Sequence, residues 1–136
     1  MRQIVSLVAI VLVLAACKKE TNDDTTPPEN NLYGRYGGTF YRTGGLDSAE
    51  VNILFRNDNT FEGNSSRYPA ICSGNFQQDG SVLTVNDTCA WTADFDWTLI
   101  FDGTYNISFT GENSVRIWRT NGTITDEYLL NRFTRY

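Results

Sequence analysis

Residues 114–130 read SVRIWRTNGTITDEYLL and carry a β-hairpin pattern from which the fold class can be argued. Two segments of alternating apolar and polar residues flank Asn121-Gly122, a dipeptide that favours a two-residue type I′ turn. Such a turn would set Val115 opposite Tyr128 on one face. It would also set Arg116 opposite Glu127, forming an ion pair on the other face. The stretch therefore predicts an antiparallel β-hairpin.

The same alternation continues through the rest of the chain beyond residue 32. No segment places apolar residues at i, i+3, i+4 and i+7 over three turns, so helices are not expected. The expected strands cover residues 35–42, 50–56, 60–65, 70–77, 81–86, 96–101, 104–110, 114–120 and 123–133. Clusters of Gly, Asn and Asp separate them. Short strands at regular spacing predict an all-β fold, an antiparallel up-and-down barrel of eight to nine strands.

The connection at Asp102-Gly103 sets the register between two of these strands. A three-residue loop, Phe101-Asp102-Gly103, would pair Leu99 with Tyr105 and keep the apolar faces of both strands together. A two-residue loop would separate those faces, because a one-residue slip turns every side chain to the opposite face. We therefore expect residues 96–101 to pair with the strand that follows them.

The N-terminal segment has the form of an export signal. Arg2 precedes an apolar run from Ile4 to Ala16. As a helix with a rise of about 1.5 Å per residue, this run is too short to cross a hydrocarbon core of ~30 Å. The run ends in Leu14-Ala15-Ala16-Cys17, which resembles the lipobox of bacterial lipoprotein signal peptides. This resemblance implies that residues 1–16 are a signal peptide and that Cys17 carries the lipid anchor.

Composition indicates where the folded domain begins. Residues 17–31 contain the lipidated cysteine and a polar stretch without apolar side chains other than proline, which predicts a disordered tether. Residues 32–136 form the expected barrel domain. The formal net charge of the chain is −5 at pH 7. Because nucleic acids and anionic lipids attract Lys/Arg clusters, neither is an expected partner. The lipid on Cys17 is then the expected contact with the membrane.

The remaining cysteines predict a disulfide. The chain has three cysteines, and lipidation of Cys17 leaves Cys72 and Cys89 in an oxidising compartment. A bond between them would close a loop of about 17 residues and stabilise the domain by roughly 3 kcal/mol. The alternative is a pair of free buried thiols.

Several segments together resemble the small lipocalin-like lipoproteins of Gram-negative bacteria, whose domain is a calycin-type meander barrel. The segments that carry the resemblance are Tyr33–Phe40, Phe55–Phe61, Cys72–Phe76, Phe95–Ile100 and Tyr128–Phe133. The resemblance implies a lipocalin-like barrel and an outer-membrane location. The chain departs from true lipocalins in lacking their Gly-x-Trp opening and in being shorter. A short eight-stranded barrel fills much of its interior with its own side chains.

Catalytic chemistry has little support. The chain has no histidine, which excludes His-based triads and most transition-metal sites. Asp94 and Asp96, near Asp87, would offer paired carboxylates, but alternating polar residues on the outer face of a strand give the same pattern. Asn57-Asp58-Asn59 resembles part of a calcium loop but lacks the later Gly and Glu, so a hairpin turn is expected. We expect no enzyme activity and no cofactor or metal.

Aromatic residues give the candidate binding site. Trp91, Phe95 and Trp97 lie in a connection beside the second disulfide cysteine, and aromatic loops at a barrel mouth are where ligands or proteins bind. The alternative is that these rings cap the barrel and pack on the disulfide. The expected function is a non-catalytic envelope lipoprotein, monomeric, binding a small apolar ligand at the barrel mouth. The alternative function is a protein-binding inhibitor, of the lysozyme or protease type, presented from the membrane.

Two short motifs resemble acceptor sites of a bacterial periplasmic O-glycosylation system. They are Asp24-Thr25-Thr26 and Asp47-Ser48-Ala49. Thr25 and Ser48 are therefore candidate modification sites.

Overall fold

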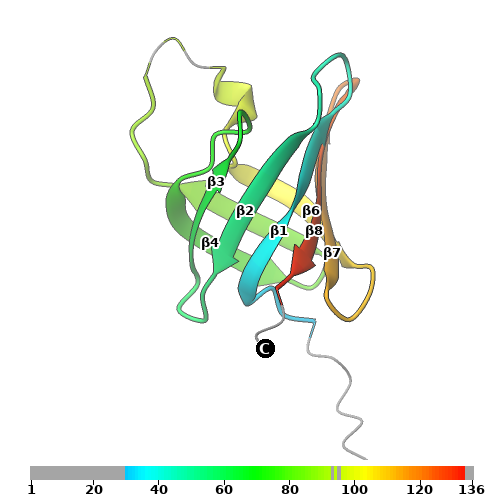
Figure 1. Ribbon diagram of the computed structural model, residues 1–136. Helices are drawn as coiled ribbons and strands as arrows, with labels where there is room; N and C mark the ends of the chain where they lie inside the picture. Colours follow the sequence, from blue (N-terminus) through cyan, green and yellow to red (C-terminus); the bar gives the residue numbers. More distant parts are fainter. Residues whose placement is uncertain (1–29, 93, 95, 134–136) are drawn as a thin grey trace, which may run out of the picture.

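The computed structural model describes residues 30–92, 94 and 96–133, which form a closed antiparallel β-barrel of eight strands (Figure 1). The strands are β1 (Gly34–Arg42), β2 (Ala49–Phe55), β3 (Thr60–Ser65), β4 (Ser73–Asp79), β5 (Val82–Asp87), β6 (Gly103–Phe109), β7 (Ser114–Asn121) and β8 (Ile124–Arg132). Each strand pairs with the next in sequence, and β8 closes the barrel against β1. The predicted all-β up-and-down barrel is confirmed, with eight of the nine expected strands present.

Some sequence predictions fall on residues outside the described ranges. These are the signal peptide, the lipidation of Cys17, the tether up to residue 29, the acceptor Thr25 and the candidate ligand contact Phe95. Ser48, the other candidate acceptor, is exposed between β1 and β2.

The barrel interior is filled by aromatic and branched side chains. Along each strand the inward-facing residues are buried in alternation, as the period of two requires. Phe101 has no exposed surface. Its ring centroid lies 5.0 Å from that of Tyr128, 5.2 Å from Tyr105, 5.6 Å from Phe61 and 6.5 Å from Phe55. Rings at these separations occupy the centre of the barrel and leave it packed.

The two ends of the barrel differ. The first and last described residues lie at one end, with the β2–β3, β4–β5 and β6–β7 turns; we name it the terminal end (Figure 1). The other end carries the β1–β2, β3–β4 and β7–β8 connections and residues 88–102, which join β5 to β6. We name it the cleft end. Residues 88–102 are the longest connection in the described domain.

The expected strand at residues 96–101 is wrong. Trp97–Leu99 form a single 3-10 turn, and the Asp96 side chain caps it by accepting a hydrogen bond from Thr98 N. The alternation of Trp97, Leu99 and Phe101 imitates a strand, but the capping aspartate offers the backbone a local partner instead. Tyr105 pairs with Leu83, not with Leu99. The polypeptide therefore crosses the barrel end here before β6 begins.

The turn between β7 and β8 is displaced by one residue from the predicted position. Asn121 pairs with Ile124, so Gly122 and Thr123 form the turn, with Gly122 at φ 61°. The register shifts by two residues, and Ile117 rather than Val115 lies opposite Tyr128. An even shift keeps every side chain on its predicted face. The predicted ion pair between Arg116 and Glu127 is present.

Candidate functional site

A disulfide fixes the start of the 88–102 connection. Cys72 and Cys89 are bonded, with their Cα atoms 6.3 Å apart, which confirms the predicted pairing. Cys72 immediately precedes β4, whereas Cys89 follows β5 by two residues. Cross-linking two adjacent strands at the cleft end restricts where the connection can run after it leaves β5.

A buried carboxylate and two arginines fix the other end of the connection. Asp126, on β8, faces inward and is only 4% exposed. Its Oδ1 accepts from Arg42 Nε at 2.5 Å, and its Oδ2 accepts from Arg42 Nη2 at 2.8 Å and from Arg119 Nε at 3.1 Å. Burial of a charged group requires such pairing. The hydrogen bond to Asp126 raises the pKa of Arg42 above its ordinary value, so this arginine stays charged.

The same two arginines bind the backbone of the crossing segment. Arg42 Nη2 donates to Thr98 O at 2.7 Å, and Arg119 Nη2 donates to the same oxygen at 2.8 Å. Arg119 Nη1 donates to Asp102 O at 2.6 Å. The β3–β4 connection contributes a further contact, because Ala70 N donates to Leu99 O at 2.9 Å. Residues 97–102 are therefore held in one position over the barrel end.

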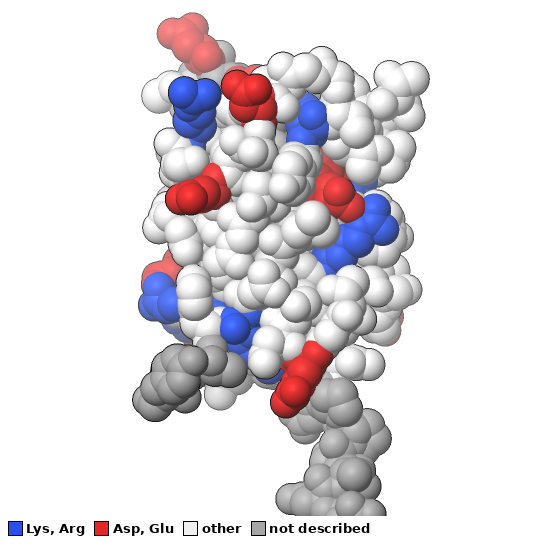
Figure 2. Space-filling model, turned by 45° about the vertical axis from the view of Figure 1, so that its right-hand side comes forward, with Lys and Arg blue, Asp and Glu red and all other residues white. Residues whose placement is uncertain are grey.

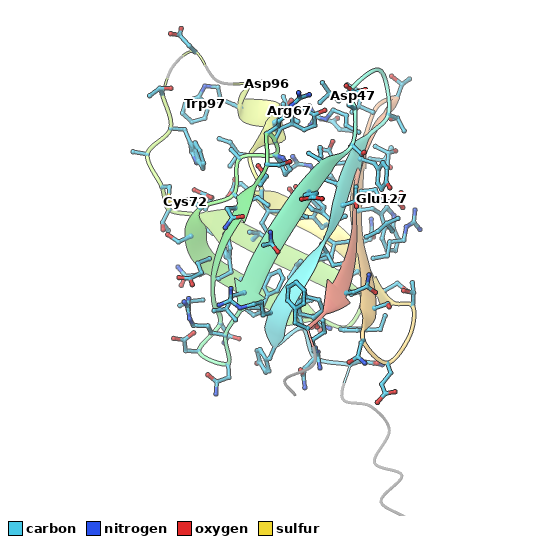
Figure 3. All side chains as sticks on the ribbon, in the orientation of Figure 1. Asp47, Arg67, Cys72, Asp96, Trp97 and Glu127 are labelled. Atoms are coloured by element: carbon cyan, nitrogen blue, oxygen red, sulfur yellow. A yellow bond between two sulfur atoms is a disulfide. The ribbon has the colours of Figure 1, made fainter. Side chains whose placement is uncertain are left out.

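Trp97 projects from this fixed segment into solvent. Its exposed fraction is 58%, the largest among the large hydrophobic residues that the structure describes. Trp91, by contrast, is half-buried, and its Nε1 donates to Asp87 Oδ1 at 3.0 Å. The same Asp87 oxygen accepts from Cys89 N at 2.8 Å. Figure 3 shows Trp97 and Asp96 together at the cleft end, above Cys72.

The two tryptophans line a cleft of about 420 Å³ at the cleft end. The other lining residues are Arg42, Asp87, Cys89, Thr98, Ile100, Asp102, Arg119, Asn121, Ile124 and Asp126. The lining is thus partly aromatic and aliphatic and partly charged. The cleft lies outside the packed core, between the 88–102 connection and the ends of β1, β7 and β8.

The sequence predicted part of this site. Trp91 and Trp97 are brought to one cleft, while Phe95 is outside the described residues. Sequence reasoning missed Arg42, Arg119 and Asp126. A signal was present: each stands at a position in phase with the apolar inward-facing residues of its strand, where a charged side chain is unusual.

The predicted placement of Asp94 and Asp96 on one side of a strand is wrong, because the described residues between β5 and β6 form no strand. The pKa of Asp96 is lowered by hydrogen bonds from the Thr98 side chain and backbone, whereas a general acid needs a raised pKa. Asp58, in the β2–β3 turn, accepts from Thr60 N at 3.0 Å, as the predicted hairpin turn requires. Among the residues described, no group of three or more His, Cys, Asp or Glu could hold a metal ion.

The terminal end has a different hollow, of about 770 Å³. It lies beside Asn30 and Asn31, which the sequence assigned to the tether but which contact the barrel. Gln78 Nε2 donates to Asn30 O at 2.9 Å, and Arg132 Nη2 donates to Asn31 O at 2.6 Å. Five amide side chains line this hollow together with Tyr33, Phe76, Ile107 and Phe109, and no tryptophan is among its lining residues.

Comparisons with known proteins assign neither a family nor a function to the chain. No family model matches the chain, and no curated protein or solved structure is significantly similar to it. Within the described part of the chain, no helix has the length and apolar character needed to cross a membrane.

Proposed function

We propose that this protein is a non-catalytic lipoprotein of the outer membrane that uses the cleft to bind a protein partner. The membrane part of the proposal rests on the sequence: a short apolar segment ending in Leu14-Ala15-Ala16-Cys17. The binding part rests on the geometry of the cleft end. Its single strongest support is Trp97, an indole that is 58% exposed on a segment held by several hydrogen bonds.

An ordered exposed tryptophan favours contact with another molecule. Leaving a large apolar ring in water forgoes about 1.5–3 kcal/mol of burial free energy. Tryptophan is enriched among the residues that dominate binding energy at protein interfaces. Because hydrogen bonds from Arg42 and Arg119 already hold the segment, little conformational entropy remains to be lost on binding. Trp97 thus has the properties of a preformed anchor.

The packed core argues against an apolar ligand inside the barrel. Phe101 and its neighbouring rings occupy the space in which larger barrels hold ligands. A partner that contacts the outside of the cleft end needs no internal cavity. The protein-binding alternative predicted from the sequence is therefore favoured over an enclosed small ligand.

The position of the termini supports presentation of the cleft away from the membrane. Asn30 lies at the terminal end, opposite the cleft end (Figure 1). A lipid on Cys17 would hold the terminal end nearer to the bilayer. The surface is also unlike that of a nucleic-acid-binding protein. On the face in Figure 2, isolated acidic and basic side chains are scattered over a mostly uncharged surface, whereas nucleic acids reward clustered basic residues.

A small apolar ligand in the cleft is a second candidate, supported by one observation. The cleft volume of about 420 Å³ falls in the range of roughly 300–1,000 Å³ found for small-molecule sites. Such a ligand would stack on the indoles outside the barrel rather than enter it.

A photo-crosslinking amino acid at position 97 tests the function in native cells. We expect irradiation to give a discrete protein adduct from position 97 and none from position 118, which lies on the outer barrel wall. A lipid or small-molecule adduct from position 97 would favour the second candidate. Absence of any adduct would overturn both.

The lipid anchor needs a separate test. Cys17→Ala should abolish labelling by radioactive palmitate and leave an uncleaved or mislocalised chain, because the Cys17 thiol would be the acylation point. Normal labelling of this variant would overturn the lipoprotein proposal.

A further inference from the structure

We infer that the cleft receives a basic side chain, lysine or arginine, of the protein partner, packed against Trp97 and near Asp87. This inference rests on the proposed function and deepens it by naming the chemistry of the partner. It is carried by the charge inside the cleft, by the state of the two arginines and by the exposed indole.

The cleft lining has an excess of negative charge. Asp87, Asp102 and Asp126 face two cations, Arg42 and Arg119. Asp96 lies beside the cleft with its side chain 55% exposed, and its carboxylate is 3.7 Å from Arg42 Nη1. A cationic group entering the cleft would therefore reduce the charge imbalance, whereas an anionic group would increase it.

The two arginines are already occupied by the protein itself. Arg42 donates to both oxygens of Asp126 and to the backbone and side-chain oxygens of Thr98. Arg119 donates to Asp126 and to three backbone carbonyls, those of Thr98, Ile100 and Asp102. A guanidinium has five N–H donors. Nearly all of them are used here, so these cations are structural clamps and not a site for an anionic ligand.

Asp87 adds a negative charge to the lining of the cleft. Asp87 Oδ1 accepts from Cys89 N and Trp91 Nε1, but the buried Asp87 Oδ2 has no hydrogen-bond partner among the described residues. Because that oxygen has almost no accessible surface, a cation entering the cleft would be attracted by the charge of the Asp87 carboxylate rather than supply a missing hydrogen bond.

Trp97 supplies the surface against which such a cation would lie. Within the described part of the chain, each cation–ring contact pairs an arginine with a ring other than Trp97: Arg116 with Trp118, Arg119 with Tyr105, and Arg132 with Tyr36. Tryptophan is the best aromatic partner for a cation. Its exposed face is therefore suited to a lysine or arginine from outside.

The test follows the indole N–H signals of the lipid-anchored protein in detergent micelles, labelled with nitrogen-15 at tryptophan. The probes are three acetylated and amidated tripeptides with the sequences Gly-Lys-Gly, Gly-Gln-Gly and Gly-Glu-Gly. We expect the lysine peptide to shift the Trp97 signal saturably, the glutamine peptide to bind at least about fivefold more weakly, and the glutamate peptide to give no shift. Equal binding of the lysine and glutamine peptides, or tighter binding of the glutamate peptide, would overturn the inference.

A pair of matched variants places the cation. Asp87→Asn keeps Oδ1 as an acceptor but removes the charge, and should weaken the lysine peptide at least about threefold. Asp47→Asn, in the exposed β1–β2 connection, should leave its binding unchanged. The Trp118 signal reports whether each variant remains folded. Equal effects of the two substitutions would contradict the proposed position of the cation.

The two proposals can fail separately. A protein cross-linked at position 97, together with peptides that bind without preference for charge, would retain the proposed function and reject the basic side chain. Absence of a cross-linked protein would reject the proposed function, and the inference about its partner with it.

Discussion

Each end of the barrel is closed by an arginine that lies over a tyrosine ring and donates hydrogen bonds to the backbone of a covering segment, and the cleft end has more of these contacts. At the terminal end, Arg132 lies over the ring of Tyr36 and donates to its hydroxyl and to Asn31 O. At the cleft end, Arg119 lies over the ring of Tyr105, 4.7 Å from its centroid, and donates to the carbonyls of the crossing segment. In both places an inward-facing arginine ties a chain segment across the barrel.

The difference lies in what each end has to hold. Leu32 is 1% exposed and covers the terminal end. It lies only two residues before β1, so this end is covered by residues that adjoin a barrel strand in the sequence. The cleft end is closed by a long connection. It has a second arginine, a buried carboxylate and a disulfide, and it still leaves Trp97 in water. Closing the barrel explains the fixed backbone, but it does not explain the exposed indole, and this is why we propose binding at the cleft end.

Removing Asp126 should have the largest effect on stability. Asp126→Ala removes the carboxylate that pairs with Arg42 and Arg119. Arg42, whose side chain is 9% exposed, then keeps only the 3.7 Å contact to Asp96 as an ion pair among the described residues. We expect a loss of about 3–5 kcal/mol in the free energy of unfolding. Denaturant unfolding followed by circular dichroism measures it. The matched control is Glu127→Ala, which breaks the more exposed pair with Arg116 and should cost less than about 1 kcal/mol. Similar losses for the two variants would show that the ion pairs of Asp126 contribute no more stability than the pair between Arg116 and Glu127.

Breaking the disulfide should have the next largest effect. The Cys72→Ser/Cys89→Ser double variant should lose about 3 kcal/mol, because the closed loop no longer restricts the unfolded chain. The Trp91 indole should also become more accessible to acrylamide, since Cys89 lies two residues before it. The accessibility of Trp118, on the outer wall, serves as the internal control. A free-thiol titration that finds two reactive groups in the unreduced wild-type protein would contradict the bond itself.

Alkaline pH should weaken both ends through their buried tyrosines. Burial raises the pKa of Tyr105 to about 12 and also raises the pKa values of Tyr128 and Tyr36. The unfolded chain ionises these phenols near pH 10, so the stability they contribute is fully present below pH 10 and is lost as pH rises toward 12. For Tyr105 alone the loss is between roughly 2 and 3 kcal/mol. Tyr105→Phe should flatten this decline, whereas Tyr33→Phe, at an exposed site, should not.

Loss of the Asp96 cap should have the smallest effect on stability and a larger effect on Trp97. Asp96→Ala removes the hydrogen bonds to Thr98, and we expect a cost of about 0.5–1 kcal/mol. Because hydrogen bonding lowers the pKa of Asp96, its contribution is present above the ordinary aspartate pKa. It disappears as pH falls through the lowered value. The tryptophan fluorescence emission of the Asp96→Ala variant measures the effect on Trp97, and Asp94→Ala is the control. Equal changes in emission for the two variants would mean that the Asp96 cap does not orient the indole.

The sequence was sufficient for the barrel because the barrel depends on local patterns. Alternation and turn residues located eight strands. The predicted register at the Gly122 turn was wrong by two residues, an even number, so each side chain still lies on its predicted face of the sheet. The segment 96–101 failed because Trp97, Leu99 and Phe101 have the period of a strand, while their geometry is set by Asp96 and by two arginines. Arg42 comes from a strand 56 residues earlier in the chain than Thr98. No local pattern contains that contact.

The candidate site was predicted only in its aromatic part for the same reason. Trp91 and Trp97 lie near each other in sequence and next to a cysteine, so composition alone drew attention to them. Asp126 and Arg42 are 84 residues apart, and the clamp that they form with Arg119 appears only once β8 has closed against β1. The charge of the cleft, from which we infer the chemistry of a partner, follows from that closure.

In our description Trp97 is exposed and yet rigidly held at the cleft end. The decisive measurement is time-resolved fluorescence anisotropy, in the presence of acrylamide, of a variant with Trp97 as its single tryptophan, Trp91→Phe/Trp118→Phe. We expect efficient quenching together with an anisotropy that decays at the rate of whole-protein tumbling. Weak quenching would place the ring inside the fold, and a dominant fast decay would show that the segment is not preformed. Either result would contradict the proposed anchor.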